Sequence, residues 1–313
     1  MTIIGSTSGA KYNPNLSSLP SVDVSSKKLA EKTQSGQQVN TQPIAPLEVS
    51  QIFPAPIGKD GVIFLNPAYI SMTKCPIVSY WAEDRFEGAL QKMVFTLIAP
   101  LNGKDTLSLG YSQTSVADIP LTAIDSSGKF IQTGSFSDED NTLSLGFSIK
   151  PLHGVTMAGG LNYLFGRIYD SSYSASSFDL GVSWYLPFSS NEFGLMMDAS
   201  INNVGGTKIP WSTGSMDTVP MTTSLGGLFA AKIYAEDTLY LSVHNNSNSP
   251  IDNLSVAAKY VMRGILSLSA GYDTGGGLTY GVGLNLNKLK LDYNYRLHPE
   301  LGGTQQVGFG VEI

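Results

Sequence analysis

The chain has 313 residues and a net charge of −6, which together with the lack of a basic cluster gives no electrostatic basis for binding nucleic acid. Only 14% of the residues are charged, against roughly a quarter in soluble domains. A single cysteine excludes internal disulfides and cysteine-rich metal sites, and we expect neither a metal nor another cofactor. No apolar run is long enough for a transmembrane helix.

Residues 1–57 are rich in Ser, Pro, Asn, Gln and Lys and show no apolar periodicity. Such a composition predicts a flexible N-terminal tail, because it offers too little apolar surface to offset the entropy of ordering. The alternative is that part of the tail becomes ordered against a partner or inside the following domain. The first eight residues lack the pattern of a signal peptide, so for a secreted protein we expect the signal to precede this numbering.

Residues 58–74 contain an apolar run, 61–65, that stops at Asn66 and Pro67. Asn caps the chain locally, and Pro has no N–H to donate to a strand ladder. An apolar segment interrupted just before the first strand suits a short plug built around Asn66, Pro67 and Ala68. A simple turn is the alternative interpretation.

Residues 75–313 show strict alternation of apolar with small or polar residues, most clearly in 278–287 and 288–297. Strands of about ten residues exceed the usual five or six of soluble sheets and match the length that a tilted strand needs to cross a bilayer. We therefore expect an all-β fold, an antiparallel transmembrane β-barrel with the apolar positions facing lipid. The fourteen expected strands are 75–82, 89–100, 105–115, 142–150, 154–165, 177–187, 192–203, 220–233, 238–245, 253–262, 264–273, 278–287, 288–297 and 304–313.

The expected connections alternate between short and long, as in an up-and-down barrel with tight turns at one end and long external loops at the other. Short links are expected at 101–104, 153–154, 263–264 and 287–288, for example. Long polar links are expected at 116–141, 166–176 and 203–219, among others.

With these strands in place, the chain resembles the PorV/PorQ-type outer-membrane proteins, relatives of the FadL long-chain fatty-acid transporters. The residues that carry the resemblance are Asn66-Pro67-Ala68, the strand end 201–205, and the C-terminal blocks 291–295 and 301–305. The resemblance implies a bacterial outer-membrane protein in contact with membrane lipids. It also implies either transport of hydrophobic small molecules, with a fatty acid or another amphipathic ligand, or service as a partner in protein secretion or assembly.

Eight charged residues are assigned to the polar side of the strands, and if the apolar side faces lipid they line the lumen. They could bind the head group of an amphipathic ligand. The alternative, which we favour, is an internal network of ion pairs such as Arg296 or Lys290 with Asp198 or Asp292. The candidates are Lys150, Asp198, Lys232, Lys259, Arg263, Lys290, Asp292 and Arg296.

Catalysis has little support, because the three histidines lack metalloprotease spacing and no G-x-S-x-G elbow is present. We therefore expect no enzymatic activity. The alternative from another class is a soluble or surface-attached β-sandwich that binds protein partners, in which the apolar face of each strand would be buried between two sheets.

Overall fold

The computed structural model describes residues 66–73, 75–102, 104–187, 193–233, 237–247, 253–274, 277–298 and 302–313. The expectations for the tail 1–57 and for residues 58–65 lie outside these ranges. Within them, no helix is both long and apolar enough to cross a membrane. A short 3₁₀ helix, η1 (Pro67–Met72), precedes the first strand.

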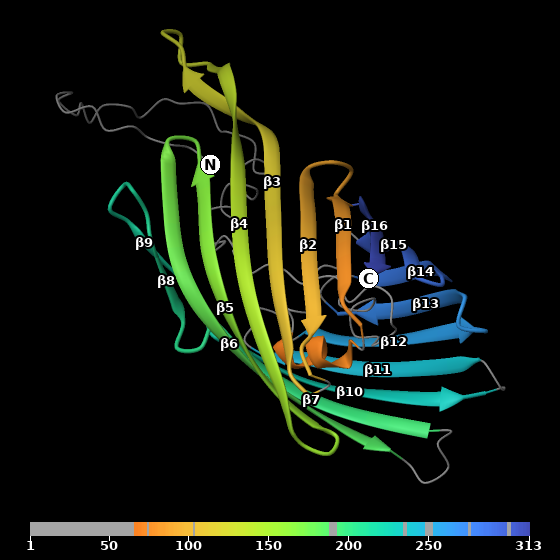
Figure 1. Ribbon diagram of the computed structural model, residues 1–313. Helices are drawn as coiled ribbons and strands as arrows, with labels where there is room; N and C mark the ends of the chain where they lie inside the picture. The colour runs from red at the N-terminus through yellow and green to blue at the C-terminus, as the bar shows by residue number, and fades with distance from the viewer. Residues whose placement is uncertain are drawn as a thin grey trace.

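Fourteen strands close into one antiparallel barrel, as the alternation predicted. β1 pairs with β16 along nine residues, and the two strands lie side by side, orange and blue, in Figure 1. A sandwich would leave two open sheets, so that alternative is wrong. The barrel strands are β1 (Ile77–Arg85), β2 (Leu90–Pro100), β3 (Thr106–Ile124), β4 (Phe130–Leu152), β5 (Val155–Ile168), β6 (Ser171–Pro187), β7 (Phe193–Asn202), β10 (Thr222–Lys232), β11 (Thr238–Ser247), β12 (Asn253–Met262), β13 (Leu266–Asp273), β14 (Gly277–Leu286), β15 (Leu289–His298) and β16 (Gly302–Glu312).

The burial of alternate residues is inverted relative to a soluble protein. In β14, the apolar side chains of Leu278, Tyr280 and Val282 are 44%, 51% and 41% exposed, whereas Thr279 is 2% exposed. Small polar residues such as Ser144 and Ser255 line the inner wall and are fully buried. An outer face of this kind would be unfavourable in water and is the face that a barrel presents to lipid.

The two ends of the barrel differ. We call the end where β1 begins and β16 ends the short-turn end; the two-residue links from β4 to β5 and from β14 to β15 lie there. At the opposite end, the long-strand end, β3 and β4 project beyond the other strands (Figure 1).

Two of the expected long loops are wrong. Residues 116–141 mostly continue β3 and β4 up to a turn at 125–129, and residues 166–176 continue β5 and β6 up to a two-residue turn. The alternation disappears there because both faces of the projecting strands meet water, while the backbone ladder needs only a paired neighbour. The third, 203–219, contains a separate hairpin of β8 (Thr207–Pro210) and β9 (Met216–Val219).

The β8–β9 hairpin packs on the inner side of the projecting wall. Ile209 and Val219 form a buried cluster with Leu164 and Tyr173, whose side chains lie on the inward face of β5 and β6. The Tyr173 hydroxyl donates to Asp140 Oδ1 at 2.6 Å. The hairpin therefore covers part of the inner wall at the long-strand end.

Candidate functional site

The candidate site is the inner wall of the barrel where η1 lies against it. Asn66 starts this helix with an extended backbone, and its side-chain oxygen accepts from the Ala68 N–H at 3.0 Å. Pro67 occupies the first helical turn, where its missing N–H is not needed. The Asn-Pro-Ala sequence therefore builds its own helix start without help from the barrel.

Four polar contacts fix η1 and its capping residue Asn66 to three different strands. Asn66 Nδ2 donates to Asp198 Oδ1 on β7 and to the carbonyl of Ala199, both at 3.3 Å. Tyr69 Oη lies 3.0 Å from His244 Nε2 on β11. The hydroxyls of Ser71 and Thr156, on β5, are 3.0 Å apart. The helix thus bridges strands that are far apart in sequence.

Two glycines make room for these contacts. A Cβ at Gly181 would lie 2.1 Å from Asn66 Oδ1, so the helix can rest on β6 only because residue 181 has no side chain. Gly226 on β10 is paired with Asp198 on one side and with His244 on the other. A Cβ there would lie 2.0 Å from His244 Nε2, so the bare glycine lets His244 reach across β10 to Asp198 Oδ2 at 3.3 Å.

Two apolar clusters surround η1 on an inner face that is otherwise mostly polar. Tyr69 packs with Met196, Leu228 and Ala257, and Met72 and Tyr240 flank this group. We call the barrel side chains of this group, Met196, Leu228, Ala257 and Tyr240, the apolar wall. On the other side of the helix, a second cluster buries Ile70 among Ile77, Trp81, Val94 and Ile98. Both clusters are almost completely shielded from solvent.

Five of the eight charged candidates lie on the inner wall. Asp198, Lys259 and Lys290 are 6%, 4% and 1% exposed. Asp292 lies within electrostatic reach of Lys259 and Lys290. Arg296 Nη2 is 3.0 Å from Asp273 Oδ2.

The ion pairs differ from those that the sequence suggested. Lys290 pairs with Glu312 on the neighbouring strand β16, and Arg296 pairs with Asp273 on β13. Asp198 faces His244 rather than a lysine or arginine. Barrel closure and strand register decide which residues lie opposite each other. The alternation within one strand therefore could not predict that the partners of Lys290 and Arg296 lie on β16 and β13.

The remaining three candidates lie at the short-turn end and differ from the expectation of lumen-lining side chains. Lys150 is exposed next to an irregularity in the β4–β5 pairing, and Lys232 is exposed at the last residue of β10. Arg263 is exposed in the β12–β13 turn with a positive φ of 49°. The alternation that assigns side chains to the lumen does not extend into turns or strand ends.

The sequence reasoning did not single out several residues of the site. Tyr69 is the second residue after Pro67, and an aromatic side chain so close to the expected plug could have marked it as a residue of the site. His244 lies on the polar side of β11, but its proximity to Asp198 follows only from the shared neighbour Gly226. Glu83, Arg85 and Lys92 form a further charged group on the inner face of β1 and β2, where Arg85 pairs with Glu83.

Within the described ranges, no group of three or more His, Cys, Asp or Glu residues is arranged to hold a metal ion. No protein-family model matches the chain, and no curated protein matches its sequence. Solved structures do share its fold. The P. putida toluene transporter TodX has a TM-score of 0.51 at 9% identity, covering 83% of this chain and 94% of TodX.

A FadL homologue from Pseudomonas aeruginosa has a TM-score of 0.50 at 12% identity, covering 87% of this chain and 98% of the homologue. The barrel is similar in fold to these two proteins. At such low identity the likeness concerns the fold, while the naming as a PorV/PorQ-type protein stays a resemblance.

Proposed function

We propose that this chain is an outer-membrane channel for small apolar or amphipathic molecules, closed by η1. The observation that carries the proposal is the apolar wall around Tyr69. Elsewhere the inner face is dominated by Ser, Thr and charged residues, whereas Met196, Leu228 and Ala257 form an apolar surface directly under the helix. Apolar pockets with a few polar groups are typical of small-molecule sites.

In this mechanism, the ring of Tyr69 and the side chain of Met72 occupy the surface that a ligand would use. A ligand reaches the apolar wall when η1 moves away, and its own apolar surface then replaces that of the helix. The polar contacts at Asn66, Tyr69 and Ser71 set the cost of this movement. Each contact is worth about 0.5–1.5 kcal/mol, so together they favour the closed position of η1 but still allow it to leave the wall reversibly.

The shared fold with a protein described as a toluene transporter and with a FadL homologue supports transport as the general role. The exposed apolar band supports contact with outer-membrane lipids. A role as a partner in secretion or assembly stays a prediction from the resemblance, and no contact among the described residues favours it.

The charged candidates have a secondary place in this proposal. Lys290 and Arg296 already have carboxylate partners, which supports the interpretation as internal ion pairs. Lys150 and Lys232 lie exposed at the short-turn end and are the candidates for a ligand head group that remains hydrated there.

A reversible disulfide tests the proposal. With Cys75→Ser as background, Ser71→Cys and Thr156→Cys place two thiols where hydroxyls are now 3.0 Å apart, so oxidation should fix η1 to β5. In proteoliposomes, uptake of toluene or a fatty acid should stop on oxidation and return on reduction of the same sample.

Equal uptake in the oxidised and reduced states would contradict gating by η1. Absence of uptake in both states, together with co-purification of a stoichiometric protein partner and no apolar ligand, would favour the secretion or assembly role instead. The matched control is the Cys75→Ser protein without the cysteine pair, which should not respond to oxidation.

A further inference from the structure

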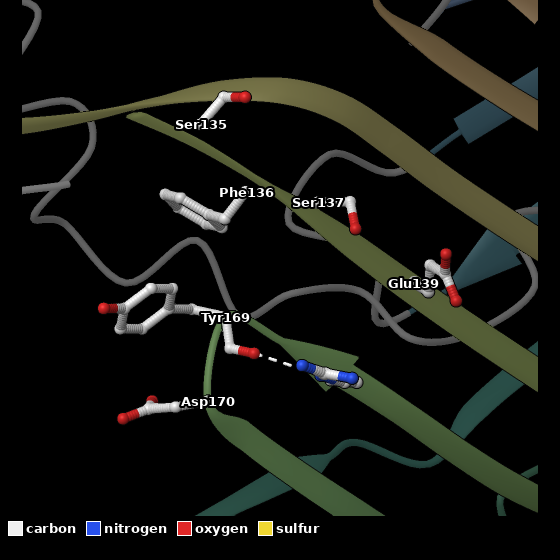
Figure 2. A pocket seen from close by; sticks show the side chains of 7 residues that line it. Ser135, Phe136, Ser137, Glu139, Tyr169 and Asp170 are labelled. Atoms are coloured by element: carbon white, nitrogen blue, oxygen red, sulfur yellow. Dashed lines mark hydrogen bonds between the residues drawn. The ribbon is translucent and has the colours of Figure 1, made fainter. Parts of the chain in front are cut away.

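A cavity of about 500 Å³ opens at the long-strand end, between β4 and the β5–β6 turn (Figure 2). It lies beyond the apolar band at the rim of the barrel, where Ser135, Ser137 and Glu139 share the outward face of β4 and Phe136 lies on the opposite face. Leu143 and Tyr163 are the last outward apolar pair, and Glu139 and Arg167, four residues further along each strand, line the cavity. None of the residues that line it belongs to η1 or to the apolar wall, so the cavity is distinct from the candidate site described above.

Glu139 and Arg167 are directly paired across β4 and β5, yet no ion pair joins them in the part of the chain that the structure describes. Arg167 Nε donates instead to the carbonyl of Tyr169 at 3.1 Å, the dashed contact of Figure 2. The guanidinium and the carboxylate both remain available to a third group.

An aromatic pair forms one end of the cavity. The rings of Phe136 and Tyr169 have centroids 5.6 Å apart in an edge-to-face arrangement and face each other in Figure 2. Tyr169 has a φ of 54° in a two-residue turn, a conformation that usually selects Gly, Asn or Asp. The turn itself does not require an aromatic residue at position 169, so the Tyr169 ring is a feature that the cavity can use.

The charges select the class of ligand. An anion would meet the carboxylates of Glu139 and Asp170, and a cation would meet the guanidinium of Arg167. Hydroxyl groups, by contrast, can donate to the carboxylates and accept from the guanidinium. The volume is within the range of about 300–1,000 Å³ that is typical of small-molecule sites.

We propose that this cavity binds an uncharged saccharide, with its C–H face against Tyr169 and its hydroxyls on Glu139, Asp170 and Arg167. The saccharide is either free in solution or part of a surface glycolipid, since the cavity opens just beyond the apolar band. The proposal does not depend on transport through the lumen.

The test uses the full chain, purified in detergent, and a panel of neutral, acidic and amino sugars as probes. Wild type should bind neutral sugars, and Glu139→Gln and Tyr169→Asn should each weaken binding at least ten-fold. Asn suits the left-handed turn position, so the second variant removes the ring without straining the turn. Asp118→Asn is the control, because Asp118 is exposed on β3 with a similar φ of 55° and lies outside the cavity.

Retention of a co-purified glycolipid that is lost in Tyr169→Asn would identify the lipid-linked source, whereas binding of soluble sugars alone would identify the free one. Absence of neutral-sugar binding in wild type, a preference for acidic or amino sugars, or equal binding by all variants would overturn the proposal. Locking η1 with the Ser71–Thr156 cysteine pair should leave saccharide binding unchanged, which separates this site from the proposed channel.

Discussion

If η1 closes the proposed channel, replacing Gly181 by Ala should favour the open state without weakening the barrel. The new Cβ would lie 2.1 Å from Asn66 Oδ1 and 3.1 Å from both Ala68 N and Pro67 Cδ, so the Asn66 side chain must leave its present position and the start of η1 must shift by a few tenths of an ångström. The barrel itself loses nothing, because Ala is favoured over Gly within a strand by about 0.5–1 kcal/mol. The substitution therefore separates closure from folding.

The expected loss of free energy for closure by η1 follows from the hydrogen bonds that Asn66 loses. Its bonds to Asp198 and to the Ala199 carbonyl are each worth about 0.5–1.5 kcal/mol, so closure weakens by about 1–3 kcal/mol. The population with η1 displaced should rise roughly 5- to 150-fold, as for coupling energies of that size.

Two assays report this change. Conductance in planar bilayers should rise, and the rate at which cysteines at positions 71 and 156 cross-link should fall. Gly160→Ala is the matched control, because Gly160 also faces inward but its Cβ would meet nothing closer than Asp179 Cβ at 3.6 Å. If Gly181→Ala conducts and cross-links as Gly160→Ala does, η1 is not the closing element.

Three further outcomes are expected. Val282→Lys, at the middle of the outward face of β14, should cost about 2–4 kcal/mol of unfolding free energy in lipid vesicles, and a negligible cost would show that this face does not meet lipid. Arg296→Gln should lower the unfolding free energy by about 2 kcal/mol in the same assay. Breaking a fully buried ion pair costs roughly 3–5 kcal/mol, and the loss here is smaller because the Arg296 side chain that faces Asp273 is 18% exposed. Hydrogen bonds from the Tyr260 hydroxyl and, to a lesser extent, from the Arg263 N–H hold the pKa of Asp237 below its ordinary value, so Tyr260→Phe should raise that pKa in an NMR titration. Because the folded-state pKa is lowered, the stability from this contact is lost as pH falls through it. An unchanged titration in Tyr260→Phe would exclude the contact.

The sequence by itself determined the barrel. Residues 278–297 alternate strictly, and the structure has strands at Gly277–Leu286 and Leu289–His298, within a residue of expectation. The prediction succeeds because a strand between lipid and a polar lumen must alternate at every step, so each residue carries the signal. Where both faces meet water, as in residues 116–141, the signal vanishes and the strands were mistaken for a loop.

The site was decided by tertiary structure. Asn66 was a plug candidate from its own neighbours, but its contact with Asp198 spans 132 positions in the chain. The approach of His244 to Asp198 depends on Gly226, whose missing side chain matters only once the register of three strands is fixed. Local patterning specifies which face a residue occupies, whereas closure of the barrel decides which residues of that face meet.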